Sequence, residues 1–259
     1  MWEKELQVAS AAAREAGKIL KRRFGGPLNV RKKGVIDLVT DVDLQAEKAV
    51  LQLIRARFPS DRILAEESGG QGQSPERTWI IDPLDGTTNF AHGFPFFAVS
   101  LALEVAGEIA LGIVYNPHLE EYFEAVRGSG ALLNGRPVTV SDTTEIGDSL
   151  LATGFPYDIQ DSGEDVLELF GRVTKKAQGV RRPGSAALDL CYVACGRFDG
   201  FWEKGLNPWD TAAGSIIARE AGGMLATYSG TDYTPYEKTV VAANPALLEE
   251  MLRVINSND

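Results

Sequence analysis

The sequence predicts an α+β protein of two halves, in which a mostly antiparallel sheet is followed by an α/β unit. Two helical patterns occupy the first 58 residues, and β-rich runs joined by short turn signals follow between residues 96 and 140. From residue 149 onward, strand-like and helix-like segments alternate. We expect an N-terminal half over residues 1–142 and a C-terminal half over residues 143–259. They should pack as one rigid unit with a cleft between them, because no linker or low-complexity tract separates the two.

Two amphipathic helices open the chain. Apolar residues spaced alternately four and three apart from Trp2 to Phe24 predict the first helix, which ends at Gly25-Gly26-Pro27. The second is expected over about residues 44–58, with Asp41 or Asp43 as its N-cap. This pair of acids does not begin an EF-hand, since helix-forming residues follow it instead of the third ligand, the glycine and the glutamate of such a loop.

Two short strands lead into acidic residues. The strand expected over residues 62–65 runs into Glu66. A second, buried strand is expected over residues 79–81 and should stop at Asp82, because Pro83 biases the preceding residue away from helical geometry.

Hairpins complete the first half. Ala106-Gly107 joins the first two of its later strands, and Asn134-Gly135 favours a type I′ turn inside the last run. These expected strands are residues 96–105, 108–115, 121–126 and 131–140.

The second half alternates strands with helices. Its helices are predicted over residues 163–177, 185–195, 208–221 and 245–255, and its strands over 149–153, 180–181, 198–202, 224–228 and 239–242.

Composition excludes several classes of protein. With 259 residues and 44% hydrophobic content, the chain can bury an ordinary core. Its 36 acidic and 26 basic residues give a net charge of −10, which argues against a nucleic-acid or anionic-membrane binder. No apolar run reaches the ~18 residues of a membrane span, and the N-terminus lacks a signal-peptide pattern, so we expect a cytoplasmic protein. Cys191 and Cys195 are expected to be buried thiols.

The stretch that carries most chemical information is residues 79–89, Trp-Ile-Ile-Asp-Pro-Leu-Asp-Gly-Thr-Thr-Asn. Asp82 and Asp85 flank a turn, and Thr87 or Thr88 is expected to cap a following helix whose free N–H groups form an anion seat. Two carboxylates beside such a seat suggest divalent cations held against a phosphate. The alternative is that both aspartates only end a strand and form a turn.

This stretch resembles the metal-binding signature of the inositol monophosphatase family, magnesium-dependent and lithium-sensitive phosphatases of sugars and polyols. Other stretches match the family in the same order, and the resemblance covers about residues 32–244. Asn207-Pro208 departs from the animal members and is typical of bacterial ones. The matching stretches are Lys32 to Asp43, Glu66 at its strand end, Gly184 to Ala187, Glu203, and Trp209 to Gly214.

The resemblance implies a role for each candidate residue. One metal would bind Glu66, Asp82 and the backbone carbonyl of Leu84, a second Asp82, Asp85 and Asp210, and a weaker third would lie near Glu66. The expected ions are two or three Mg²⁺, with Mn²⁺ as a substitute. Without the resemblance, Glu66 and Asp210 would be a surface acid and a helix-start acid.

The remaining implied roles concern water and substrate. Thr87 and Asp43 would activate the attacking water, and Lys32 would be the base on a mobile active-site loop. Gly86 and Thr87 would hold the phosphate, with Leu84, Asp85 and Asp210 beside it. Gly184, Ser185 and Ala186 would form a substrate loop, and Glu203 would accept hydrogen bonds from sugar hydroxyls. Arg181-Arg182 is either a solvated pair or a seat for a second anionic group.

We therefore expect hydrolysis of myo-inositol 1-phosphate by in-line attack of a metal-activated water, without a phosphoenzyme. Fructose-1,6-bisphosphatase and 3′(2′),5′-bisphosphate nucleotidase activities are the alternatives within the superfamily. An aspartyl-nucleophile phosphatase is disfavoured, because its Asp-x-Asp spacing is absent from residues 82–85. A metal- or protein-binding module without turnover is the alternative of a different class. The resemblance also implies a layered α-β-α-β-α sandwich and a homodimer.

Overall fold

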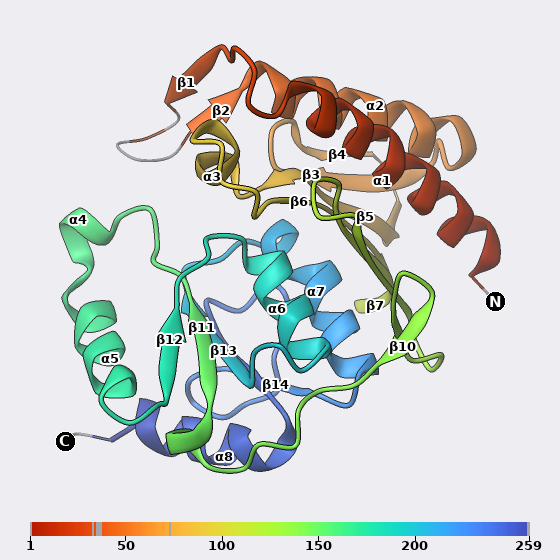
Figure 1. The fold of residues 1–259 in the computed structure, drawn as a ribbon. Helices are drawn as coiled ribbons and strands as arrows, with labels where there is room; N and C mark the ends of the chain where they lie inside the picture. Colours follow the sequence, from red (N-terminus) through yellow and green to blue (C-terminus); the bar gives the residue numbers. More distant parts are fainter. Residues whose placement is uncertain (1, 33, 35–37, 73, 258–259) are drawn as a thin grey trace.

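The protein folds into five alternating layers of helices and sheets (Figure 1). The computed structural model describes residues 2–32, 34, 38–72 and 74–257. Helices α1 (Glu3–Arg23) and α2 (Asp41–Arg57) cover an eight-stranded sheet, and α6 (Ala186–Ala194) and α7 (Pro208–Glu220) lie between it and a five-stranded sheet. Helices α5 (Glu164–Thr174) and α8 (Pro245–Ile255) cover the outer face of the second sheet. The α-β-α-β-α arrangement expected from the resemblance is confirmed.

The eight-stranded sheet has the order β10-β9-β8-β7-β6-β5-β3-β4. All neighbouring strands pair antiparallel except β3 and β5, which are parallel. Both predicted turns have positive φ at their two central residues: 52° and 80° at Ala106 and Gly107, 51° and 76° at Asn134 and Gly135. The strands are β3 (Asp61–Ala65), β4 (Gly69–Gln71), β5 (Ser74–Asp85), β6 (Ala98–Val105), β7 (Glu108–Asn116), β8 (Glu121–Val126), β9 (Ala131–Leu133) and β10 (Arg136–Val138).

The five-stranded sheet has the order β12-β11-β13-β15-β14. Its central strand β13 pairs parallel with β11 and antiparallel with β15, so the second sheet is mixed. The strand β15, near the C-terminus, lies between β13 and β14. The strands are β11 (Leu150–Thr153), β12 (Gly179–Arg181), β13 (Gly200–Lys204), β14 (Met224–Ala226) and β15 (Thr239–Ala243).

The prediction that the central strand stops at Asp82 is wrong, because β5 continues to Asp85. Asp82 pairs with Ser100 and Asp85 with Ala98, so three steps along β5 match two along β6. This extra residue is a β-bulge, and Pro83 lies inside it, where the ladder is interrupted and no N–H is required.

The predicted helix caps next to the site are also wrong. Helix α3 (Thr87–Ala91) begins after Gly86, which has a φ of 90° and takes the N-cap position assigned to Thr87 or Thr88. Helix α2 begins at Asp41 with Thr40 as N-cap, because Thr40 and Asp43 form a reciprocal capping box.

Five short elements had no sequence signal. A hairpin of β1 (Val30–Lys32) and β2 (Leu38–Thr40) precedes α2, and β4 extends the first sheet. A 3₁₀ turn, η1 (Ile146–Asp148), and helix α4 (Ile159–Ser162) precede β11 and α5. Each is three or four residues long, too short for periodicity to show.

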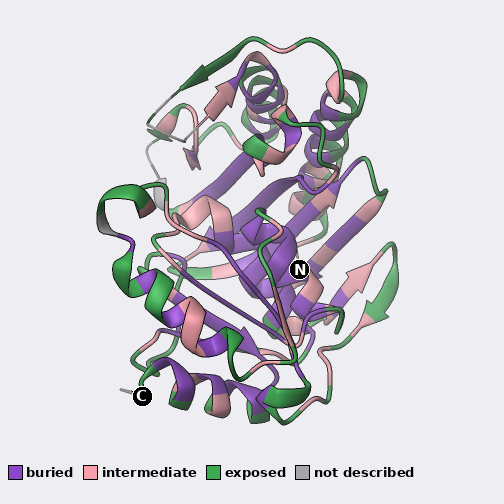
Figure 2. Cartoon of the chain, turned by 60° about the vertical axis from the view of Figure 1, so that its left-hand side comes forward, coloured by how far each residue is buried: buried purple, intermediate pink, exposed green. Residues whose placement is uncertain are grey.

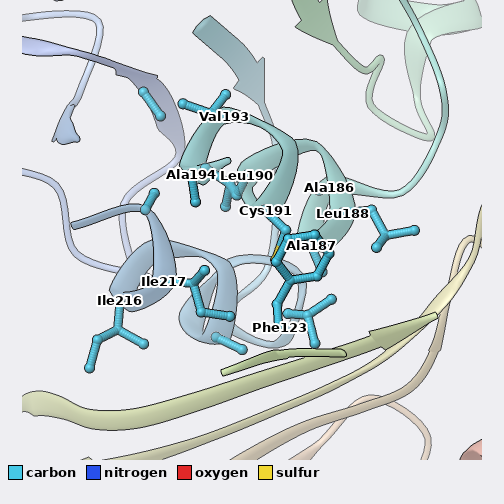
Figure 3. Close-up of a cluster of buried hydrophobic side chains, with 14 of the residues drawn as sticks. Phe123, Ala186, Ala187, Leu188, Leu190, Cys191, Val193, Ala194, Ile216 and Ile217 are labelled. Atoms are coloured by element: carbon cyan, nitrogen blue, oxygen red, sulfur yellow. The ribbon is translucent and has the colours of Figure 1, made fainter. Parts of the chain in front are cut away.

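Three apolar clusters fill the spaces between the layers, and Figure 2 shows the burial along both sheets and the inward helix faces. The middle cluster joins the two halves. In Figure 3, α6 and α7 lie side by side above the first sheet, and Phe123 points from that sheet toward Cys191. As predicted, Cys191 is a buried free thiol, whereas Cys195 is half-buried.

Helix α7 approaches the first sheet closely because Gly112 has no side chain. A Cβ on Gly112 would lie 2.7 Å from the carbonyl oxygen of Ala213. None of the helices within the described ranges is long and apolar enough to cross a bilayer.

Candidate active site

The predicted site residues gather where the end of β5 meets the first turns of α3, α6 and α7. Two adjoining cavities lie there, of about 180 and 250 Å³. Both are lined by Asp85, Gly86, Tyr157, Asn207 and Asp210. The smaller one adds Glu66, Asp82, Leu84, Thr87 and Trp209, so all four predicted metal-binding acids border one space. The larger one adds Gly184, Ser185, Ala186, Glu203 and Arg182 from the C-terminal half, among others.

The β-bulge presents Asp82 and Asp85 to the same cavity, although they are three residues apart. The Asp82 carboxylate accepts a hydrogen bond of 2.9 Å from the Leu84 N–H. Both aspartates are buried, with 2% of Asp82 and 9% of Asp85 exposed. In a regular strand, residues three apart face opposite sides, so the extra residue is what brings these two together.

Asp85 is held by the C-terminal half. Its Oδ2 accepts hydrogen bonds of 2.6 Å from the Ser185 hydroxyl and 2.8 Å from the Ala187 N–H. These donors belong to the N-cap and first turn of α6, whose dipole also favours a carboxylate. The predicted substrate loop therefore also positions a predicted metal ligand.

Asp210 and Glu66 reach the cavity from two further elements. Asp210 is the third residue of α7, and its carboxylate accepts a 2.6 Å hydrogen bond from the Asn207 N–H within a capping box. Glu66 follows β3, where its own N–H donates to the Ile81 carbonyl at 3.1 Å. The next N–H, that of Glu67, donates to the buried carboxylate of Glu47 at 3.0 Å, which fixes the turn.

The acids repel one another in this buried position. Burial raises the pKa of Asp82 well above its ordinary value, and the charges of Glu66, Asp85 and Asp210 raise it further. Burial also raises the pKa of Asp85 to about 6, against the opposing hydrogen bonds from Ser185 and Ala187. A cation would relieve this repulsion.

The donor set fits a hard divalent cation. The carboxylates and the Leu84 carbonyl offer oxygen atoms, which Mg²⁺ prefers over nitrogen and sulfur as ligands. Among the described residues, however, no three His, Cys, Asp or Glu side chains are already spaced as a ligand group. Asp82, Asp85 and Asp210 each place one carboxylate oxygen on a protein donor.

Thr87 and Asp43 form a buried polar chain beside the acids. The Thr87 hydroxyl lies 2.9 Å from Asp43 Oδ1 and 3.0 Å from the Leu84 carbonyl oxygen. The other oxygen, Asp43 Oδ2, accepts from the Thr40 N–H at 2.9 Å and from its hydroxyl at 2.5 Å. Burial raises the pKa of Asp43 although these hydrogen bonds lower it. The capping box of α2 thus orients the side chain that faces Thr87.

Glu203 forms part of the larger cavity, as the resemblance implied. It lies on β13 and is 7% exposed. Burial, followed by the charges of Asp210 and Asp85, raises its pKa well above the ordinary value, and Arg182 opposes this. The Arg182 guanidinium stacks on the Phe155 ring at 4.8 Å. Arg181 instead donates to the Val180 carbonyl and is absent from the residues lining either cavity.

Within the described residues, two predicted site residues do not line the cavities: Asp43, which contacts Thr87 from behind the wall, and Lys32, which the structure places away from them. It is exposed on β1, and the described residues that line the two cavities do not include it. Asp37, which belongs to the same matching stretch, lies outside the described residues.

Sequence reasoning missed two residues. Asn89 ends the quoted stretch but had no assigned role, and its Nδ2 lies 2.7, 2.8 and 3.2 Å from the carbonyl oxygens of Phe96, Pro183 and Gly184. Tyr157 lines both cavities from a loop and had no signal in the sequence.

The layered fold and its acid-lined cavity fit a phosphatase, a hydrolase of phosphate monoesters, and the family match assigns the chain to this class. The chain belongs to the inositol monophosphatase family, whose model matches residues 1–258.

Individual relatives agree with this family. The inositol-1-monophosphatase of Synechocystis is 44% identical over 252 residues, 96% of this chain and 88% of that protein. The Nus factor SuhB of Escherichia coli K12 is 41% identical over 250 residues, 95% of this chain and 94% of that protein. The crystal structure of the extragenic suppressor protein suhB from Bartonella henselae has a TM-score of 0.95 at 40% identity and covers 99% of this chain and 100% of that one.

Proposed function

We propose that this phosphatase hydrolyses inositol monophosphate, releasing inositol and phosphate from myo-inositol 1-phosphate. The observation that carries the proposal is the pair of adjoining cavities. One is bordered by Glu66, Asp82, Asp85 and Asp210, and the other, bordered by Glu203, is large enough for a polyol ring. A phosphate between them would have acids and cations on one side and its ring on the other.

Mg²⁺ is the cation that this donor set favours. We infer two or three ions, the first held by Glu66, Asp82 and the Leu84 carbonyl, the second by Asp82, Asp85 and Asp210, and a weaker third near Glu66. When bound, such ions neutralise the phosphate and lower the pKa of a water. Binding requires the carboxylates to be ionised, so it releases protons and weakens at low pH. Inhibition by lithium and replacement by Mn²⁺ are inferred from the family.

The chain's own groups would orient water and phosphate. The Thr87 hydroxyl can accept a hydrogen bond from the attacking water while it donates its own proton to Asp43 Oδ1, 2.9 Å away. Asp43, whose pKa is raised by burial, is suited to receive that proton. The N–H groups of Gly86 and Thr87 at the start of α3 would bind the phosphate oxygens.

Glu203 would accept hydrogen bonds from ring hydroxyls, and Gly184, Ser185 and Ala186 would form the wall beside the ring. Arg182, which lines the same cavity, is the observation that keeps a bisphosphate substrate as the second candidate. Lys32, exposed on β1, would be the base that the family resemblance assigns to the active-site loop. We further infer two halves, over residues 1–142 and 143–259, a homodimer and a cytoplasmic location.

Phosphate release decides the proposal. We expect hydrolysis of myo-inositol 1-phosphate with Mg²⁺ and none after chelation by EDTA, with kcat/KM compared against fructose 1,6-bisphosphate and a 3′,5′-bisphosphate nucleotide. A lead of about tenfold for either bisphosphate, 1.4 kcal/mol in transition-state binding, would replace the substrate. Absence of turnover on all three would instead favour a binding module without catalysis.

A further inference from the structure

The carboxylate of Glu203 occupies the space that a side chain at residue 154 would fill. A Cβ built on Gly154 would lie 2.2 Å from Glu203 Oε1, 2.3 Å from Oε2 and 2.4 Å from the carboxyl carbon. These distances are far shorter than any van der Waals contact. Gly154 and Glu203 both line the 250 Å³ cavity, so the contact belongs to the wall against which a ring would lie.

The second sheet fixes these two residues side by side. Gly154 follows the last residue of β11, and Glu203 follows Trp202, the partner of Thr153 in the parallel pair β11–β13. The Thr153 hydroxyl donates a 2.6 Å hydrogen bond to the Trp202 carbonyl and locks this register. Because the backbone positions are set by the sheet, the Glu203 side chain is the part that can move.

A Cβ at residue 154 would meet only the end of a flexible side chain. All three nearest atoms belong to the Glu203 carboxyl group, and the backbone of Gly154 is outside the left-handed region that favours glycine. An alanine would therefore be accommodated by displacement of the carboxylate. Glu203 is 7% exposed and lines the cavity, so displacement would move the carboxylate out of the position from which it meets ring hydroxyls.

We propose that Gly154 is a positioning residue for substrate specificity. By having no side chain, it lets Glu203 lie back against the end of β11, where its carboxylate can accept hydrogen bonds from ring hydroxyls. This proposal rests on the role of Glu203 in the proposed function. It adds that recognition of a polyol requires a residue without a side chain on the neighbouring strand.

Gly154→Ala tests it in a way that a purely structural role would not reproduce. We expect KM for inositol 1-phosphate to rise by about tenfold, the cost of losing one hydrogen bond to a charged group, with kcat changed less than about threefold. An aryl phosphate without hydroxyls, such as p-nitrophenyl phosphate, should keep its kcat/KM. Gly171→Ala is the matched control, because nothing lies within 4 Å of a Cβ there.

Double variants separate the possible failures. Glu203→Ala should weaken hydrolysis of inositol 1-phosphate but not of the aryl phosphate, as Gly154→Ala does. Gly154→Ala/Glu203→Ala should have the same kinetic constants as Glu203→Ala alone, because the carboxylate that the new methyl group would displace is absent. In the Gly154→Ala background, Glu203→Asp shortens the acid by one methylene and should lower KM part of the way back to that of the unchanged protein. If Gly154→Ala fails to fold, Gly154→Ala/Glu203→Ala should fold, because the clash is gone.

The outcomes that overturn the proposal are specific. Equal losses on inositol 1-phosphate and the aryl phosphate, or additive effects in the double variant, would refute the role of Gly154. If Glu203→Ala separated the two substrates and Gly154→Ala did not, the positioning role of Gly154 would be refuted and the role of Glu203 would stand. No discrimination by Glu203→Ala would refute the ring-binding role of Glu203, which belongs to the proposed function, and the proposal with it.

Discussion

Burial in the folded protein disfavours the ionised form of Asp85. Its pKa is about 6 in the folded protein against 3.8 ordinarily. The folded chain therefore holds this proton more tightly than the unfolded chain does. Below about pH 4 Asp85 is protonated in both states and does not lower the free energy of unfolding. As the pH rises through 6, the free energy of unfolding falls, by at most about 3 kcal/mol above that pH.

Asp85→Asn should therefore abolish turnover while the metal-free protein becomes more stable at pH 8, by at most about 3 kcal/mol. The asparagine amide oxygen can still accept from Ser185 and Ala187. Urea unfolding in EDTA at pH 4.5, 6 and 8 measures the difference, which should shrink as the pH falls. A difference of the same size at all three pH values would contradict a raised pKa.

Thr87 should be required for the chemical step rather than for binding. Thr87→Ala should lower kcat by about 10²–10⁴-fold, the range for a lost proton-transfer group, with KM little changed. Thr87→Ser keeps the hydroxyl that faces Asp43 and should retain most of the rate. The check is steady-state phosphate release at saturating Mg²⁺. A serine variant as slow as the alanine variant would mean that the methyl group, through packing, is what matters.

At the scale of elements, the turn from β5 into α3 sets the site. Gly86 has a φ of 90°, and a Cβ there would lie 3.0 Å from the Phe96 carbonyl oxygen and 3.2 Å from that of Gly184. Gly86→Ala should cost about 1–2 kcal/mol for the backbone alone, plus the cost of pushing two carbonyls away, and should reduce turnover.

Gly93→Ala is the control for this turn. Gly93 has a φ of 72°, yet nothing lies within 4 Å of its Cβ position. Its variant should show the backbone cost and keep full activity. Thermal unfolding and phosphate release on both variants measure the difference. Equal stability and equal activity of the two would show that the close approach at Gly86 has no effect.

Elements differ in how far the sequence predicts them. The long periodic helices and both hairpin turns were predicted, because their signals are local. The Thr40–Asp43 capping box is also visible in the sequence, but Asp41 and Asp43 are equally good N-cap residues by type, so the pattern alone does not decide between them. The bulge at Pro83 was not predictable, since it depends on β6 pairing across from it. Likewise, the residues of the site were identified from motifs, whereas their convergence required both sheets.

At the scale of the whole molecule, Asn89 connects the halves. Its amide lies within 3.2 Å of carbonyl oxygens from Phe96 in one half and from Pro183 and Gly184 in the other. Asn89→Ala should cost about 1–3 kcal/mol for the unpaired carbonyls and lower kcat by loosening Ser185 and Asp85.

Asn89→Asp should be worse, because it places a carboxylate against those carbonyls. Thermal unfolding and kcat, measured together, test both variants. Stability lost without any loss of rate would confine Asn89 to a structural role.

The two halves should unfold together. The middle apolar cluster contains Ile80 and Phe123 from the first half, and Leu190 and Ile217 from the second. The other two clusters each lie within one half, so separation would expose the shared cluster and leave each half with only part of its core. Calorimetry of the whole chain should show one transition with equal calorimetric and van't Hoff enthalpies. Two resolved transitions would show that the halves are independent domains.

The insertion of β15 between β13 and β14 has a consequence for synthesis on the ribosome. Residues 239–243 emerge after both strands that flank them in the sheet, yet they pair with the strand that carries Glu203. A nascent chain can form its first sheet early, but the second sheet remains open at β13 until β15 has been synthesised. The cavity wall that Glu203 forms is therefore completed only once β15 has paired, and termination before β15 would leave an unpaired, aggregation-prone strand edge at β13.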